Sequence, residues 1–168
     1  MRTDKRESGL FVAYEKLFAD LKDKPIKYLE VGVSYGDSLT WAQKYFTKGT
    51  ILGVDSLEYV EIPKQALFYK LDQNDSEGLT KLGQEQGPFD IIIDDASHVA
   101  KETENTFNNL YPFLKVNGIY IIEDWGAGYF PQWSHCIGME KLVTDLVWKY
   151  GGQVLKDPSC FAIIRKNE

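Results

Sequence analysis

The sequence of 168 residues contains few cysteines and no long apolar stretch. Its two cysteines, Cys136 and Cys160, form no CxxC pair, which argues against a disulfide framework or a thiolate metal site. No apolar run approaches the roughly 20 residues that cross a bilayer, and the polar start of the chain does not resemble a signal peptide. We therefore expect a cytoplasmic protein with no membrane partner.

The sequence also lacks any run of Lys or Arg. Its 25 acidic and 19 basic residues give a net charge of -6, so we expect no nucleic-acid partner. No repeat, low-complexity tract or linker rich in Pro, Gly or Ser divides the chain. The length and the 43% of hydrophobic residues fit one compact domain over residues 1–168. The sequence leaves the formation of a homo-oligomer open.

What the chain does have is an alternation of apolar strands and amphipathic helices. We expect strands over residues 26–33, 50–54, 66–71, 89–93 and 119–122, and helices over residues 11–21, 39–46, 101–111 and 139–150. This alternation predicts an α/β, Rossmann-like fold with a mostly parallel sheet and helices on both faces. Two last strands, over 153–155 and 161–165, flank the turn Asp157-Pro158-Ser159. They predict an antiparallel hairpin that brings the sheet to seven strands.

Two smaller features of the chain concern its turns. Asn117-Gly118 predicts a turn that leads into the strand over 119–122, and residues 126–134 form an irregular aromatic loop. The aromatic side chains of this loop either stack on a bound sugar or ring, or fill a local hydrophobic gap. The sequence favours neither interpretation.

Two acidic segments stand where expected strands end. Asp94-Asp95-Ala96-Ser97-His98 follows the strand over 89–93, and Glu123-Asp124 follows the strand over 119–122. If these strands are parallel neighbours, both segments lie at one edge of the sheet, where open α/β sheets bind their ligands. The alternative for each acidic residue taken singly is a helix cap or a solvent-facing loop position.

Taken together, the acidic segments predict a metal site with a base beside it. Asp95, Glu123 and Asp124 would supply oxygen ligands, which suit Mg²⁺ or Mn²⁺ better than Zn²⁺. A bound cation would also relieve the repulsion among carboxylates that lie a few Å apart. His98, three residues after Asp95, would be the base.

A glycine-containing turn follows the first expected strand. In Glu30-Val31-Gly32-Val33-Ser34-Tyr35-Gly36, the two glycines allow the backbone to approach a ligand closely. The segment has neither the GxGxxG pattern nor a Gly-Lys-Ser/Thr loop, which favours a ligand without phosphates. Asp55 ends the next strand, where an acidic side chain either accepts hydrogen bonds from a ribose or forms a turn.

These residues resemble the class I S-adenosylmethionine-dependent methyltransferases through the E-x-G-x-x-x-G turn, the acid that ends the second strand, and the later acidic segments. The resemblance spans nearly the whole chain. Within this class, the D-D-x-S-H and I-E-D motifs, present as Asp94-Asp95-Ala96-Ser97-His98 and Ile122-Glu123-Asp124, are similar to those of metal-dependent sugar O-methyltransferases. These are the macrocin and mycinamicin types, with the related cephalosporin hydroxylase-like proteins.

The resemblance implies a role for each matching residue. Asp95, Glu123 and Asp124 would bind Mg²⁺ or Mn²⁺, and His98 would be the general base. The residues that the resemblance implies in binding S-adenosylmethionine are Glu30, Gly32, Gly36, Asp55, Asp72, Gln73 and Asp94. For Asp72 and Gln73, which would border the adenine, the alternative is a turn that caps Ser76-Glu77.

The expected activity is therefore metal-assisted methyl transfer to a hydroxyl, an O-methyltransferase reaction of the EC 2.1.1 class. An imidazole such as His98 can accept the hydroxyl proton at neutral pH. Two vicinal hydroxyls would chelate a divalent ion, so the expected acceptor is a small molecule with a sugar or another vicinal diol. Two alternatives stay open: a catechol-type O-methyltransferase, whose usual base is Lys, and a non-catalytic S-adenosylmethionine-binding sensor or subunit.

Overall fold

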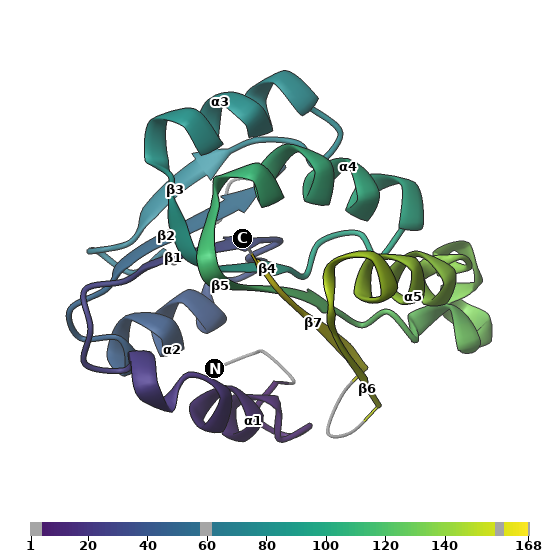
Figure 1. Cartoon of the computed structure of the whole chain (residues 1–168), viewed down its shortest axis with the longest axis horizontal. Coiled ribbons are helices and arrows are strands. Elements are labelled where there is room, and N and C mark those ends of the chain that lie inside the picture. Colours follow the sequence, from purple (N-terminus) through teal and green to yellow (C-terminus); the bar gives the residue numbers. More distant parts are fainter. Residues whose placement is uncertain (1–4, 58–61, 157–159, 168) are drawn as a thin grey trace.

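A mixed β-sheet forms the centre of the molecule (Figure 1). The structure is a computed structural model, and it describes residues 5–57, 62–156 and 160–167. In these residues, seven strands follow the order β3-β2-β1-β4-β5-β7-β6. Their bounds are β1 Lys27–Val31, β2 Thr50–Asp55, β3 Leu67–Lys70, β4 Phe89–Asp94, β5 Leu114–Glu123, β6 Gly152–Leu155 and β7 Phe161–Arg165. Strands β1 to β5 pair in parallel, and β7 is antiparallel to both β5 and β6. The predicted seven-stranded, mostly parallel sheet is confirmed, while the turn Asp157-Pro158-Ser159 lies outside the described residues.

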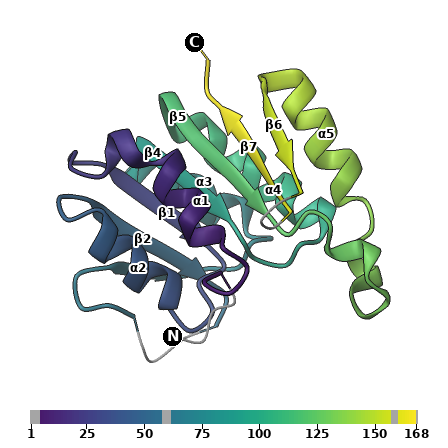
Figure 2. The same ribbon diagram turned by 90° about the horizontal axis from the view of Figure 1, so that it is seen from below.

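Helices cover both faces of this sheet, as predicted (Figure 2). The α-helices of the described residues are α1 Leu10–Leu17, α2 Asp37–Tyr45, α3 Ser76–Gln86, α4 Ala100–Leu110 and α5 Met139–Tyr150. Side chains of α1 and α2 pack into one hydrophobic cluster with one face of the sheet, and those of α3, α4 and α5 pack into a second cluster on the other face. Every described helix is too short or too polar to cross a bilayer.

The central strands are buried on both faces because helices cover both faces of the sheet. Successive side chains of a strand point to opposite faces and so enter different clusters. In β4, Ile91 and Ile93 join the cluster under α1 and α2, while Ile92 joins the cluster under α3 to α5, and all three are fully buried. The same alternation continues into the residues that follow each strand. It therefore decides on which side of the sheet each acidic side chain lies.

Helix α3 was not among the expected elements. Its sequence is mostly polar, and Leu79 and Leu82 are its buried large side chains. Asp75 caps the helix, since its Oδ1 accepts a hydrogen bond of 2.9 Å from the backbone N–H of Gly78. Two apolar positions in eleven residues are too few to stand out as a helical pattern, although they suffice once the sheet lies beneath them.

Two expectations for where elements begin or end were wrong. The first helix ends at Leu17 and continues as a 3₁₀ turn over Ala19–Leu21. Asn117-Gly118 lies inside β5 instead of opening it, because the strand begins at Leu114 and shifts register opposite Phe89 and Ile91. Asn117 takes a left-handed φ of 64°, as expected where a strand bulges. The aromatic loop contains 3₁₀ turns over Ala127–Tyr129 and Pro131–Cys136.

Candidate active site

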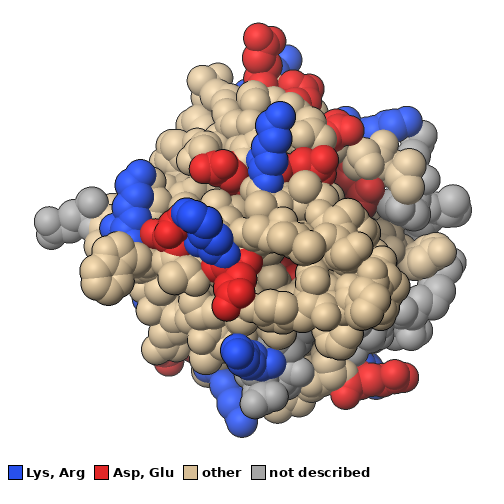
Figure 3. All heavy atoms as spheres, turned by 90° about the vertical axis from the view of Figure 1, so that its right-hand side faces the viewer, with Lys and Arg blue, Asp and Glu red and all other residues tan. Residues whose placement is uncertain are grey.

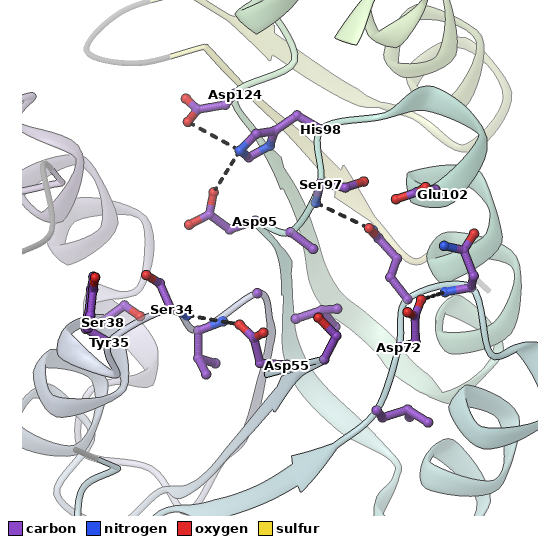
Figure 4. Close-up of a pocket in the computed structure, with 18 of the residues that line it drawn as sticks. Ser34, Tyr35, Ser38, Asp55, Asp72, Asp95, Ser97, His98, Glu102 and Asp124 are labelled. Carbon is purple, nitrogen blue, oxygen red and sulfur yellow. Dashed lines mark hydrogen bonds and ion pairs between the residues drawn. The ribbon is translucent and has the colours of Figure 1, made fainter. Parts of the chain in front are cut away.

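A cavity of about 730 Å³ lies at the carboxyl ends of the parallel strands (Figure 4). The segments that follow β1, β2, β3, β4 and β5 contribute to its walls, together with Lys5 from the segment before α1. The lining residues that the sequence predicted in a binding role are Gly32, Asp55, Asp72, Gln73, Asp95, His98 and Asp124. The cavity therefore collects predicted residues from the ends of five strands, as expected for an open α/β sheet.

Strand register brings the acidic segments together. Asp94 at the end of β4 pairs with Ile122 near the end of β5, so the residues that follow them emerge side by side. Alternation directs Glu30, Asp95 and Glu123 to the side of α1 and α2, where their carboxylate oxygens lie within 4.8 Å of one another. Asp94 points to the other side, which explains why the two adjacent aspartates have different surroundings.

Lys5 lies at the centre of these carboxylates. Its Nζ is 2.9 Å from Glu30 Oε1, 2.9 Å from Asp95 Oδ2 and 2.7 Å from Glu123 Oε1. The hydroxyl of Tyr14 in α1 also donates a hydrogen bond of 2.7 Å to Glu123 Oε1. We call Lys5, Glu30, Asp95 and Glu123 the inner cluster. Glu30 and Glu123 are buried beneath the cavity wall, at 0% and 2% exposure.

Opposing effects set the protonation of the inner cluster. Burial raises the pKa of Glu123 well above its usual value, the charge of Asp95 raises it further, and the ammonium of Lys5 lowers it. Burial lowers the pKa of Lys5, but the charges of Asp95, Glu123 and Glu30 outweigh burial and raise it well above its usual value. Lys5 thus stabilises the ionised form of a carboxylate that burial would otherwise keep protonated.

A second group of side chains opens into the cavity and shares Asp95 with the inner cluster. His98 Nε2 is 4.0 Å from Asp95 Oδ1 and 3.9 Å from Asp124 Oδ2 (Figure 4). One ligand atom from each of these three residues lies within 4.8 Å of the others. We call Asp95, His98 and Asp124 the outer cluster. Its side chains are 18%, 18% and 44% exposed, so solvent and small ligands can reach them.

Two residues of the outer cluster have a strained backbone. His98 and Asp124 have left-handed φ values of 57° and 51°, which non-glycine residues adopt rarely. Such conformations cost about 1–3 kcal/mol each and persist where the surrounding structure enforces them. Here they turn both side chains toward Asp95.

The glycine turn after β1 is held against the turn after β4. Gly32 has a φ of 87°, and a Cβ atom built there would lie 2.3 Å from the backbone oxygen of Asp95, so no larger residue fits. Asp55 Oδ2 accepts hydrogen bonds of 3.0 and 3.1 Å from the backbone N–H groups of Val33 and Ser34. Gly36 starts α2 with a φ of 76°. Asp55 thus has the turn-forming role that the sequence left open, and its contact with a ribose stays a prediction.

Gln73 joins the turns after β3 and β4. Its Nε2 donates to Asp94 Oδ1 at 3.1 Å, and its Oε1 accepts from the backbone N–H of Ser97 at 3.3 Å. Burial raises the pKa of Asp94 well above its usual value, while hydrogen bonds from Ala96 and Gln73 lower it. Asp72 makes a local turn instead of capping α3, since its Oδ1 accepts from the N–H of Asn74 at 2.7 Å. Gln73 and Asp72 line the cavity, whereas Asp94 is buried behind it.

Sequence reasoning missed several residues of the site. Ser34 and Tyr35 line the cavity from the glycine turn, and their position between Gly32 and Gly36 was a signal that could have found them. Lys5 carried no such signal, because it is 25 residues from Glu30 and 118 from Glu123.

The strand order, the glycine turn and the site at the carboxyl strand ends define the fold as that of the class I S-adenosylmethionine-dependent methyltransferases. No family model matches the chain. A curated protein with a similar sequence is mycinamicin VI 2''-O-methyltransferase of Micromonospora griseorubida, which is 32% identical over 126 residues, or 70% of this chain and 32% of the relative. A second similar protein is 8-demethyl-8-(2-methoxy-alpha-L-rhamnosyl)-tetracenomycin-C 3'-O-methyltransferase of Streptomyces olivaceus. It is 36% identical over 129 residues, or 72% of this chain and 33% of the relative.

Solved structures agree with these sequence matches. The methyltransferase MycE of the mycinamycin biosynthetic pathway, in complex with Mg, SAH and mycinamycin VI, aligns with a TM-score of 0.79 and 27% identity over 94% of this chain and 49% of its own. A putative caffeoyl-CoA O-methyltransferase from Staphylococcus aureus shares the fold alone, with a TM-score of 0.72 and 15% identity over 98% of this chain and 85% of its own. The chain is thus related to sugar O-methyltransferases of natural-product pathways, which confirms the resemblance drawn from its motifs. It spans about a third of the length of these curated relatives.

Proposed function

We propose that this chain forms the catalytic domain of an S-adenosylmethionine-dependent, divalent-metal-assisted O-methyltransferase that acts on a sugar or another vicinal diol in a small molecule. The observation that carries the proposal is the outer cluster, in which two carboxylates and an imidazole face one another at the mouth of a cavity of about 730 Å³. The relatives named above, which methylate sugar hydroxyls by name, support the same conclusion.

The residues of the outer cluster fit a divalent cation. Asp95 and Asp124 offer carboxylate oxygens within 4.8 Å of each other, and their side chains are partly exposed, so water can complete the coordination shell. Oxygen ligands with water suit Mg²⁺ or Mn²⁺. Glu123 is held by Lys5 and Tyr14, and its part in metal binding stays a prediction.

The other end of the cavity fits a nucleoside ligand. The glycine turn after β1 lines this part of the cavity, and Asp55, Asp72 and Gln73 offer polar atoms from the neighbouring turns. With no Lys or Arg in the glycine turn, this half of the cavity suits a ligand without phosphates. S-adenosylmethionine meets that description.

The chemistry requires a positioned hydroxyl and a base. When bound, S-adenosylmethionine supplies an activated methyl group, and the divalent cation orients the acceptor hydroxyl and lowers its pKa. His98 accepts the proton of that hydroxyl at Nε2, which lies between Asp95 and Asp124 in the cavity. Asp95 Oδ1 and Asp124 Oδ2 lie 4.0 and 3.9 Å from this nitrogen.

The first test is calorimetric titration of S-adenosylmethionine into chelator-treated protein, followed by titration of Mg²⁺ into wild-type protein and the Asp95→Ala variant. We expect the wild type to bind both ligands and Asp95→Ala to lose Mg²⁺ binding while it still binds S-adenosylmethionine. A panel of sugars and a catechol then separates the two acceptor classes. Absence of S-adenosylmethionine binding under all conditions would overturn the proposed function, and cofactor binding with neither a metal effect nor turnover would support a non-catalytic sensor.

A further inference from the structure

Lys5 supplies a cation inside the carboxylate cluster, where the resemblance to metal-dependent enzymes leads one to expect a metal alone. Its ammonium contacts Glu30, Asp95 and Glu123 at 2.7 to 2.9 Å. Lys5 is 5% exposed, and it also lines the cavity. Lys5 therefore contacts Asp95 and Glu123, two of the three carboxylates that are predicted to bind the divalent ion.

The two oxygen atoms of Asp95 have different partners. Asp95 places Oδ2 on Lys5 and Oδ1 toward His98, so one carboxylate belongs to both clusters. Glu123 Oε1 accepts from both Lys5 and Tyr14. Of the three predicted metal ligands, Asp95 is thus shared with Lys5, Glu123 is engaged by it, and Asp124 lies in the outer cluster.

Electrostatics makes the two cations competitors. Glu30, Asp95, Glu123 and Asp124 carry four negative charges when ionised, and Lys5 offsets one of them. A divalent ion next to Asp95 is repelled by the ammonium and meets one fewer uncompensated carboxylate. Without Lys5, however, the buried Glu30 and Glu123 would lose their cation, which is strongly unfavourable in the absence of metal.

We propose that Lys5 is a positioning residue that competes with the divalent cation for Glu123 and Asp95, so that it lowers metal affinity while it keeps the metal-free cluster folded. The proposal rests on the proposed function for its metal. The ammonium of Lys5 would pair with the carboxylates when no metal is bound, and the metal would take its place on binding. Lys5 precedes α1, so the competition also ties the N-terminal segment to the state of the site.

The test compares metal binding by wild type and Lys5→Met, titrated with Mg²⁺ in the absence of S-adenosylmethionine. We expect Lys5→Met to bind Mg²⁺ at least about tenfold more tightly, since both the repulsion and the competition for Glu123 are removed. In chelator, the same variant should unfold at a lower temperature than the wild type, and Mg²⁺ should restore much of the loss. Mg²⁺ affinity that is unchanged or weaker in Lys5→Met would overturn the proposal, as would absence of Mg²⁺ binding by every protein tested.

Matched variants separate competition from a general disturbance. Lys5→Arg keeps the charge and Tyr14→Phe removes a hydrogen bond to Glu123 without changing charge, so both should stay within about threefold of wild type in Mg²⁺ affinity. The double variant Lys5→Met/Glu123→Gln has the net charge of the wild type, and it lacks the Glu123 carboxylate that loss of Lys5 would free for the metal. Its affinity for Mg²⁺ should therefore return toward the wild-type value. This double variant also serves if Lys5→Met alone does not fold without metal. Tightening of the same size in Tyr14→Phe would overturn the proposal.

A separate titration with S-adenosylmethionine distinguishes this proposal from the proposed function. Tighter metal binding in Lys5→Met supports competition whether or not the cofactor binds. Absence of cofactor binding would overturn the methyltransferase function and leave the competition between Lys5 and metal as a property of the cluster.

Discussion

At the scale of single residues, the candidate site depends on side chains that are held in unfavourable surroundings. His98 and Asp124 adopt left-handed backbone conformations, and Glu30 and Glu123 are carboxylates in a buried position. Neither condition favours folding, so each is maintained by contacts that the rest of the molecule supplies. Residues of this kind are expected where chemistry, rather than stability, has determined the side chain.

The role of His98 can be tested by comparison with the other histidine of the chain. We expect His98→Ala to lower kcat by roughly 10²- to 10⁴-fold, which is the usual contribution of a general base, and to leave S-adenosylmethionine binding unchanged. The control is His135→Ala, because His135 is exposed in the 3₁₀ turn over Pro131–Cys136 and should tolerate the change. Steady-state rates and calorimetric titration give the two readouts. Full methyl transfer by His98→Ala would remove it as the base.

At the scale of elements, α1 both completes the core and reaches the site. Phe18, which follows α1, is fully buried and packs against Phe46 and Tyr14, with ring centroids at 5.7 and 5.3 Å. Tyr14 of the same helix donates its hydroxyl to Glu123. The helix thus connects the hydrophobic layer over the sheet with the inner cluster.

Removal of the Phe18 ring should destabilise this arrangement. We expect Phe18→Ala to lower the free energy of unfolding by about 3–5 kcal/mol, the usual cost of deleting a fully buried aromatic ring. Val12 in α1 is 56% exposed, so Val12→Ala should change stability by less than about 0.5 kcal/mol. Denaturant unfolding of both variants measures the difference. Equal stability of the two variants would show that α1 does not contribute to the cooperative core.

Element boundaries also show where sequence patterns stop being informative. Helix α5 follows its predicted bounds because six apolar residues recur at helical spacing, and Met139, Val143 and Leu146 are the buried ones. Helix α3 has two buried leucines and no comparable pattern. Asn117-Gly118 is a turn signal by composition, yet pairing of β5 with β4 on both sides of it absorbs the pair as a bulge.

At the scale of the whole molecule, acidic side chains outnumber basic ones by 25 to 19. On the face shown in Figure 3, acidic and basic side chains are interspersed, in keeping with the net charge of -6.

Tyr129, Phe130 and Trp133 are 59%, 57% and 48% exposed, so they do not fill a local gap. Of the two interpretations of this loop, the local hydrophobic plug is therefore wrong, and stacking on an acceptor stays a prediction.

Ligand binding should stabilise the whole molecule by mass action. At a free concentration of a hundred times Kd, a ligand that binds only the folded state contributes about 2.7 kcal/mol. For a chain of this size, that corresponds to a rise in Tm of roughly 5–10 °C. We expect S-adenosylmethionine to produce this shift and EDTA to remove the part that Mg²⁺ contributes, measured by thermal unfolding with and without each ligand. An unchanged Tm at saturating cofactor would contradict binding to the folded state.

The sequence by itself determined the order of the strands, the mostly parallel sheet and the edge at which the site lies. These follow from local periodicity and from the placement of Asp95, Asp124 and Asp55 after apolar strands, and both are readable within a few residues. The tertiary structure decided which face each carboxylate takes and what neutralises it. Adjacent Asp94 and Asp95 separate because strand side chains alternate, and Glu123 meets Lys5 across 118 residues, a contact that only the packing of the N-terminal segment against the sheet creates.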